Sequence, residues 1–153
     1  MKHVRTAAII THQNKILLHS NQGENYWTLP GGAVENEFTK DGIKREMKEE
    51  LGEEVVVGDL KIVAENRFLY RGKELDSIEF YYYVDLCPDS ELFELATFTK
   101  TEAFGQNEEK PYELNFKWFD LNKLEEITIL PSFLGMELTQ LSRKSIKHIE
   151  QTT

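Results

Sequence analysis

The stretch GGAVENEFTKDGIKREMKEELGEE, residues 31–54, is the most informative part of this 153-residue sequence. Its apolar residues Ile43, Met47 and Leu51 recur at intervals of four, the spacing that brings side chains onto one face of an α-helix. The pattern therefore predicts a helix over residues 38–51 and a core that packs against this apolar face.

The sequence contains residues typical of both ends of a helix. Gly52 is a typical helix terminator, and Thr39 or Asp41 could cap the start. Gly42 lies one turn before Glu46, where glycine costs about 1 kcal/mol relative to alanine in a helix interior. Room for a metal and a phosphate would explain this glycine, and fraying of the first turn would lower its cost. The sequence leaves both explanations open.

The same helix carries a sector of carboxylates beside its apolar face. Glu46 is three and four residues from Glu49 and Glu50, so their side chains are neighbours, and like charges at this spacing destabilise a helix. A hard divalent cation such as Mg²⁺ or Mn²⁺, which prefers oxygen ligands, would offset the repulsion. A solvated face, with Lys44 and Lys48 as salt-bridge partners, is the alternative.

A glycine turn precedes the helix and favours the first interpretation. Gly31 and Gly32 allow the backbone to approach a ligand or metal closely. Glu37 lies eight residues before Arg45, and an ion pair between them would fasten the turn to the helix.

These residues resemble the Nudix box, G-x5-E-x7-R-E-U-x-E-E-x-G-U, in which U is a bulky aliphatic residue. The residues that match at the required spacings are Gly31, Glu37, Arg45, Glu46, Met47, Glu49, Glu50 and Gly52. The segment WTLPGG at residues 27–32 also resembles the usual approach to the box. The resemblance implies a Nudix fold of the α+β class, with a mixed β-sheet sandwiched between α-helices and residues 1–153 forming one domain.

Two positions depart from the family pattern. The last aliphatic position is Glu53, and Val55 follows two residues later. The pattern also starts at the first glycine of the pair, whereas it usually starts at the second. We therefore favour the Gly31 carbonyl over that of Gly32 as a metal ligand.

The resemblance implies a hydrolase that cleaves the diphosphate linkage of a nucleoside diphosphate joined to another moiety, through water activated by Mg²⁺ or Mn²⁺. Glu46 and Glu50 would be the principal metal ligands, and Glu49 a further ligand or the catalytic base. Glu37 and Arg45 would form a structural pair. A Nudix-fold module that binds a nucleotide without cleaving it is the alternative.

Some members of the family carry the base on a later loop, where Glu108, Glu109 and Glu113 are the candidates here, although each is more typical of a surface carboxylate. For substrate binding we consider Gly32, Arg67 and Tyr70.

The substrate itself is not specified by the sequence. ADP-ribose hydrolases of the family tend to carry a proline about fifteen residues beyond the box, and this chain has no proline between Pro30 and Pro88. Tyr70 lies near the position of a tyrosine in dinucleoside-polyphosphate hydrolases, which is weak evidence for that activity.

Patterns outside the box predict mainly strands, which together with the helices indicate the α+β class. A hairpin around Gln13 and Asn14, a polar segment over 88–111 and a final helix over 132–149 are also predicted. The predicted strands cover residues 4–11, 15–19, 27–29, 55–57, 60–70, 77–86 and 114–119.

The composition limits the classes of partner. The net charge of −9 argues against general nucleic-acid binding and against an anionic membrane surface, and no apolar run approaches a membrane span. A small nucleotide-type molecule is the expected partner. With a single cysteine, Cys87, no intrachain disulfide can form, so we expect a reducing, cytoplasmic setting. The last helix and residues 93–104 could bury the surface of a homodimer.

Overall fold

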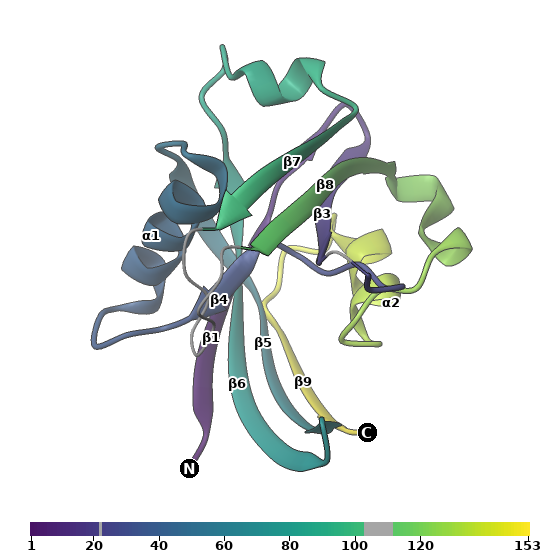
Figure 1. The fold of residues 1–153 in the computed structure, drawn as a ribbon. Coiled ribbons are helices and arrows are strands. Elements are labelled where there is room, and N and C mark those ends of the chain that lie inside the picture. Colours follow the sequence, from purple (N-terminus) through teal and green to yellow (C-terminus); the bar gives the residue numbers. More distant parts are fainter. Residues whose placement is uncertain (22, 103–111) are drawn as a thin grey trace.

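The computed structural model describes residues 1–21, 23–102 and 112–153. Two β-sheets dominate the fold, and helices are few and short apart from one (Figure 1). The strands are β1 His3–Ile9, β2 Thr11–His12, β3 Lys15–Asn21, β4 Gly31–Ala33, β5 Val56–Tyr70, β6 Lys73–Asp85, β7 Thr97–Glu102, β8 Tyr112–Asp120 and β9 Lys147–Thr152. The α-helices are α1 Thr39–Leu51 and α2 Leu134–Glu137, and the 3₁₀ helices are η1 Glu91–Glu94, η2 Leu121–Glu126 and η3 Leu138–Gln140.

The first sheet has five strands in the order β4-β1-β6-β5-β9. β1 runs parallel to β6 and antiparallel to β4, and β5 runs antiparallel to β6 and parallel to β9, so the sheet is mixed. The β5–β6 hairpin turns through Arg71 and Gly72, which both have positive φ, as expected for a two-residue turn. The turn of this long hairpin lies at the same end of the molecule as both termini (Figure 1).

The second sheet is antiparallel, with four strands in the order β2-β3-β8-β7. Gln13 and Asn14 have φ values of 50° and 64° and connect β2 to β3, so the predicted hairpin turn is confirmed. The strand predicted over 4–11, however, is divided between β1 and β2, which belong to different sheets. The predicted strand over 114–119 is also confirmed as part of β8.

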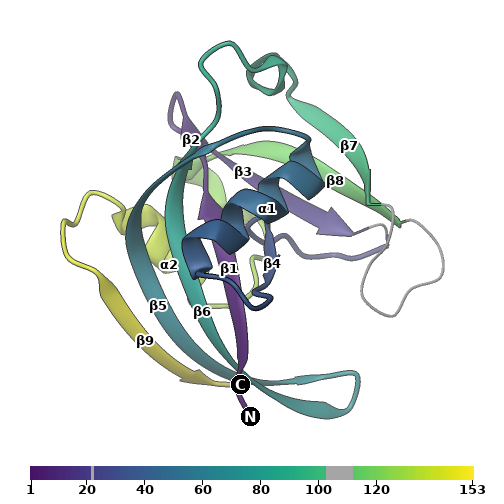
Figure 2. The ribbon, with the colours of Figure 1, turned by 90° about the vertical axis from the view of Figure 1, so that its left-hand side faces the viewer.

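Two hydrophobic clusters lie on opposite sides of the sheets. The first contains the apolar face of α1 with residues of both sheets, including Tyr82, Phe116 and Trp118. The second contains Leu134 and Leu138 of the short helices. Figure 2 looks onto α1, which lies in front of β1 and β4. Sheets between helical layers confirm the α+β prediction.

Three other strand predictions need correction. Residues 27–29 form only isolated bridges, through Trp27 and Thr28. The neighbouring glycines, which we expected to form a turn, instead form β4 because they pair with β1. The two strands predicted over 55–57 and 60–70 are one strand, β5, whose pairing with β6 is interrupted by register shifts on either side of Leu60.

The helix predicted over residues 132–149 is wrong. The helical turns end at Gln140, and β9 follows at Lys147. Side chains of the first sheet engage the carbonyls that a longer helix would need: the Tyr83 hydroxyl donates to Leu141, and the Lys61 ammonium donates to Arg143. Long-range hydrogen bonds and strand pairing therefore override the helical spacing of the leucines.

Part of the polar segment predicted over 88–111 is regular secondary structure. It contains η1 and β7, and Phe93 and Phe98 pack against the first cluster. None of the helices among the described residues combines the length and apolar character that crossing a membrane requires.

Candidate active site on helix α1

The start of α1 is fixed by contacts with the first sheet, not by a side-chain cap. Phe38 is the N-cap residue and makes no side-chain cap hydrogen bond, so the prediction of Thr39 or Asp41 as the cap is wrong. The Thr39 hydroxyl lies 2.5 Å from the Tyr82 hydroxyl, and the Thr6 hydroxyl donates to the Thr39 carbonyl at 3.3 Å. The helix is thereby anchored to β1 and β6.

The end of α1 follows the sequence pattern. Gly52 adopts a left-handed conformation with φ of 71°, and its N–H donates to the Lys48 carbonyl. A residue without a side chain adopts this conformation at little cost, so the helix stops where the glycine predicts.

Two of the box carboxylates are buried beside the apolar face of α1. Glu46 is 7% exposed and Glu50 is 5% exposed, whereas the side chain of Glu49 is 49% exposed. Burial of ionised carboxylates is costly unless cations or hydrogen bonds compensate. This arrangement is therefore not the fully solvated acidic face that was the alternative interpretation.

Arg45 connects the turn to these carboxylates. Its Nη2 donates to Glu37 Oε1 at 2.7 Å, and its Nε lies 3.0 Å from the same oxygen. Its Nη1 lies 3.1 Å from Glu46 Oε1 and 3.3 Å from both Glu49 oxygens. The expected Glu37–Arg45 pair is present, and one guanidinium contacts three carboxylates. We refer to Glu37, Arg45, Glu46, Glu49 and Glu50 as the α1 cluster.

The electrostatics of this pair follow from the hydrogen bonds. The Arg45 guanidinium holds the pKa of the Glu37 carboxyl below its ordinary value, assisted by the Glu35 N–H. Hydrogen bonding to Glu37, with further contributions from Glu46 and Glu49, raises the pKa of Arg45. Both groups are therefore charged at neutral pH.

Three glycines give the α1 cluster its shape. A Cβ on Gly32 would overlap the Glu46 carboxylate, with Oε2 only 2.7 Å away. A Cβ on Gly31 would lie 2.7 Å from the Ala7 Cα. At Gly42 a Cβ would lie 3.2 Å from Glu37 Oε1 and 3.5 Å from Thr6 Cγ2, so close packing of Glu37 and Thr6 accounts for this glycine.

The pairing of β4 with β1 determines where the glycine carbonyls point. Pro30 accepts a hydrogen bond from the Ala8 N–H, and carbonyls alternate in direction along a strand. The Gly32 carbonyl therefore faces β1, whereas those of Gly31 and Ala33 face away from it. Arg45 Nη2 donates to the Ala33 carbonyl at 3.0 Å, so this edge of β4 faces the α1 cluster.

The departure at Glu53 has a structural partner that we did not predict. The Ser90 hydroxyl donates to Glu53 Oε1, and the Ser90 oxygen also accepts the Leu92 N–H at the start of η1. Val55 packs against the first hydrophobic cluster. The helix exit is thus held by a polar link to η1, and no local pattern signals a contact between residues so far apart in sequence.

The other predicted site residues do not join the α1 cluster in the described part of the chain. Glu113 is exposed and alternates with Leu114, which packs in the α1-side cluster, so Glu113 belongs to the opposite face of its sheet. Glu108 and Glu109 lie outside the described residues.

Arg67 and Tyr70 lie on the β5–β6 hairpin. Arg67 Nε is 3.8 Å from Asp76 Oδ2, and the Arg71 guanidinium lies 5.2 Å from the Tyr70 ring centre. Burial raises the pKa of Tyr26, with a smaller contribution from the charge of Glu24.

Comparisons with known proteins identify the family and the fold. The family described as NUDIX domain matches residues 1–134, which leaves β9 outside the matched region. The uncharacterized Nudix hydrolase YvcI of Bacillus subtilis (strain 168) is 26% identical over 127 residues, covering 82% of this chain and 71% of that protein.

Solved structures share the fold at low sequence identity. An ADP-ribose pyrophosphatase from Streptococcus suis 89-1591 has a TM-score of 0.62 and 17% identity, covering 99% of this chain and 100% of that one. A UDP-X diphosphatase has a TM-score of 0.65 and 21% identity, and the match covers 97% of this chain and 67% of that one. From the family match over most of its length, we conclude that this chain belongs to the Nudix hydrolase family, whose members are pyrophosphohydrolases.

Proposed function

We propose that this protein is an active, metal-dependent hydrolase that cleaves the diphosphate linkage of a nucleoside diphosphate joined to a second moiety. The observation that carries the proposal is the burial of Glu46 and Glu50 on one helix, with the side-chain-free backbone of Gly32 directly against the Glu46 carboxylate. In the proposal, residues 1–153 work as a single domain on a small nucleotide-type substrate.

The residues of the α1 cluster fit Mg²⁺ or Mn²⁺. Glu46, Glu49 and Glu50 offer only oxygen donors, which both ions prefer. The Glu46 carboxylate lies directly against Gly32, where the side chain of any other residue would displace it. The Gly31 carbonyl, which faces away from β1, is the backbone ligand that we favour.

Each residue then has a role that its environment supports. A divalent cation, when bound, supplies positive charge to the diphosphate oxygens and lowers the pKa of water. Glu46 and Glu50, held in place by burial, are the principal ligands. Glu49 is half-exposed, so it can reach a water molecule as the base or serve as a further ligand.

Arg45 and Glu37 act as positioning residues. The guanidinium fixes the turn on the helix and partly neutralises Glu46 and Glu49 before a cation arrives. The exposed position of Glu113, on the sheet face opposite α1, favours a base within the helix over that residue.

Aromatic side chains near the hairpin turn support a role in substrate binding. Tyr70 is exposed and carries Arg71 against its ring, a combination that can stack on a nucleobase and approach a phosphate. We include Tyr70 on this ground, with Gly32 and Arg67 as further members of the substrate site.

A substrate panel tests the proposal. The protein would be incubated with ADP-ribose, nucleotide sugars, dinucleoside polyphosphates and nucleoside triphosphates, with Mg²⁺ or with a chelator, and products separated by chromatography. We expect a nucleoside monophosphate or phosphate from at least one compound, only when Mg²⁺ or Mn²⁺ is present. Tight nucleotide binding without turnover on the whole panel would contradict the proposal and favour the binding module.

A further inference from the structure

The C-terminal strand β9 brings three potential metal ligands together at the edge of the five-stranded sheet. His148 pairs with Val63 and Glu150 pairs with Glu65 in the parallel β5–β9 register. Because side chains alternate between faces, His148, Glu150 and Glu65 lie on the same face. We call Glu65, His148 and Glu150 the β9 cluster.

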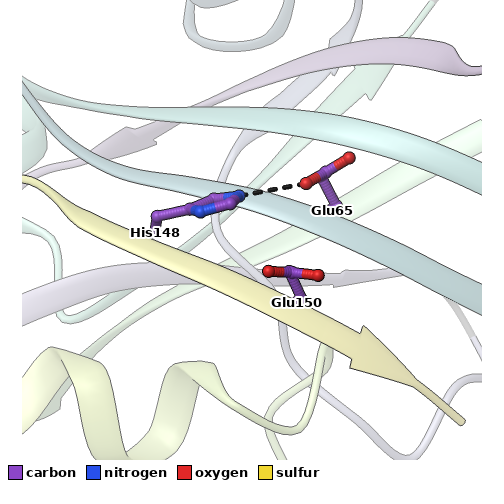
Figure 3. Close-up of side chains that lie close together, drawn as sticks. All are labelled: Glu65, His148 and Glu150. Carbon is purple, nitrogen blue, oxygen red and sulfur yellow. Dashed lines mark hydrogen bonds and ion pairs between the residues drawn. The ribbon is translucent and has the colours of Figure 1, made fainter.

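The three side chains converge (Figure 3). His148 Nε2 lies 3.0 Å from Glu65 Oε2, and one ligand atom from each residue lies within 4.8 Å of the others. Atoms at this separation can reach a common ion with small adjustments of side-chain torsions, since zinc–ligand distances are about 2.0–2.2 Å. Strand pairing therefore sets up the donors without help from a loop.

The charges around the β9 cluster are incompletely balanced. Lys2 Nζ lies 3.5 Å from Glu65 Oε1 but closer, at 2.8 Å, to Asp76. Within the described part of the chain, no lysine or arginine forms an ion pair with Glu150. The site thus presents two neighbouring carboxylates, one of which has no cationic partner there.

The surroundings also leave room for further ligands. A surface hollow of about 270 Å³ borders the β9 cluster and is lined by Lys2, Glu65, Arg67, Glu150, Gln151 and Thr152. His148 is exposed, and the Glu65 side chain is 36% exposed. Water can therefore complete the coordination of an ion held by three side chains.

We propose that Glu65, His148 and Glu150 bind a divalent transition-metal ion of the zinc class, and that this ion fastens β9 to β5. An imidazole nitrogen with two carboxylates favours zinc over Mg²⁺, which prefers all-oxygen sites. This site is separate from the α1 cluster in both residues and donor type. It depends on β9, which lies outside the family-matched residues 1–134.

Calorimetric titration with Zn²⁺ tests the site. The Glu50→Gln protein serves as background, so that binding at α1 does not dominate the signal. We expect the Glu50→Gln protein to bind one Zn²⁺ per chain. The double variant with Glu50→Gln and His148→Gln is expected to bind Zn²⁺ with at least tenfold weaker affinity. The matched control is His3→Gln, which changes an exposed histidine of β1 and is expected to leave the affinity unchanged.

Hydrogen exchange tests the fastening of β9. In the protein that retains His148, Zn²⁺ is expected to slow hydrogen exchange of the backbone amides in residues 147–152 at least fivefold. In the His148→Gln variant, Zn²⁺ is expected to leave these exchange rates unchanged. Circular dichroism without metal would establish that the variants fold. Absence of Zn²⁺ binding, equal affinity with and without His148, or exchange insensitive to Zn²⁺ would each overturn the proposal.

Discussion

The α1 cluster and the β9 cluster both gather carboxylates, but they are built in opposite ways. The α1 cluster lies within 14 consecutive positions, residues 37–50; it buries Glu46 and Glu50, and one guanidinium contacts Glu37, Glu46 and Glu49. The β9 cluster joins residues more than 80 positions apart and stays largely exposed. The first is therefore readable from helix periodicity, whereas the second exists only through strand register.

The difference also concerns energetics. Burial makes each contact of the α1 cluster consequential, because a carboxylate removed from water depends on its remaining partners. Exposed pairs contribute little to stability, commonly about 0–1 kcal/mol. Variants of the α1 cluster should thus affect activity and stability strongly, and variants of the β9 cluster only weakly unless a metal is bound.

Among variants that leave all the carboxylates in place, the largest effect on hydrolysis is expected from Gly32→Ala. The added methyl group would overlap the Glu46 carboxylate and force it or β4 to move. We predict a loss of hydrolysis of about 100-fold or more, since displacements near 1 Å can cost this much. Steady-state kinetics on the best substrate of the panel would measure it. Full activity in Gly32→Ala would contradict the geometry assigned to the α1 cluster.

The next effect concerns Arg45→Ala, which removes the cation from three carboxylates. Glu46 stays buried, so we predict a loss of about 2–3 kcal/mol in the free energy of unfolding, measured by urea denaturation. Arg45→Lys should recover only part of the loss, because an ammonium cannot reproduce the forked contacts to Glu37 and Ala33. Equal stability of the alanine and lysine variants would contradict this reading.

A buried histidine outside both clusters gives the protein a distinct acid sensitivity. Burial lowers the pKa of His19 from 6.5 to about 4. The unfolded chain therefore takes up a proton near pH 6.5 that folded His19 accepts only near pH 4, so stability falls as the pH drops through this window. The expected loss is about 3 kcal/mol, and urea denaturation at several pH values would measure it.

His19→Gln serves as the control for that pH dependence. In this variant the free energy of unfolding should no longer fall between pH 6.5 and 4 on account of residue 19. The loss of stability below about pH 4.5 should remain, because it comes from protonation of Glu37, whose pKa is lowered in the folded protein. An unchanged pH profile in His19→Gln would assign the acid sensitivity to other groups.

The smallest effect is expected in the β9 cluster without metal. His148→Gln removes one exposed hydrogen bond to Glu65, so we predict a change below about 0.5 kcal/mol in unfolding free energy and unaltered hydrolysis. Thermal unfolding with a chelator present would measure the first, and the kinetic assay the second. If His148→Gln lowered the free energy of unfolding as much as Arg45→Ala does, the β9 cluster would not differ from the α1 cluster in its contribution to stability.

Sequence patterns predicted the parts of the fold that depend on near neighbours. The apolar spacing of α1, its glycine stop and the Glu37–Arg45 pair all involve residues within about fifteen positions, and all are present. The family resemblance extended this to the mixed fold, which local patterns alone would not specify.

The features that were missed depend on distant partners. Glycines have low strand propensity, so Gly31–Ala33 becomes β4 only because β1 lies beside it. The leucine spacing after residue 132 resembles a helix, but Lys61 and Tyr83 engage its carbonyls and β5 pairs with β9. The Glu53–Ser90 contact likewise spans 37 positions.

The most direct measurement of the central claim compares Glu50→Gln with Glu54→Gln on the best substrate, as a function of Mg²⁺ concentration. The two positions are four residues apart, but Glu50 is buried whereas the Glu54 side chain is 82% exposed and pairs only with exposed Lys48 among the described residues. We predict a fall in kcat of about 1,000-fold for Glu50→Gln, or about 4 kcal/mol in activation free energy, and less than twofold for Glu54→Gln. Equal rates for the two variants would contradict the assignment of the α1 cluster as the active site.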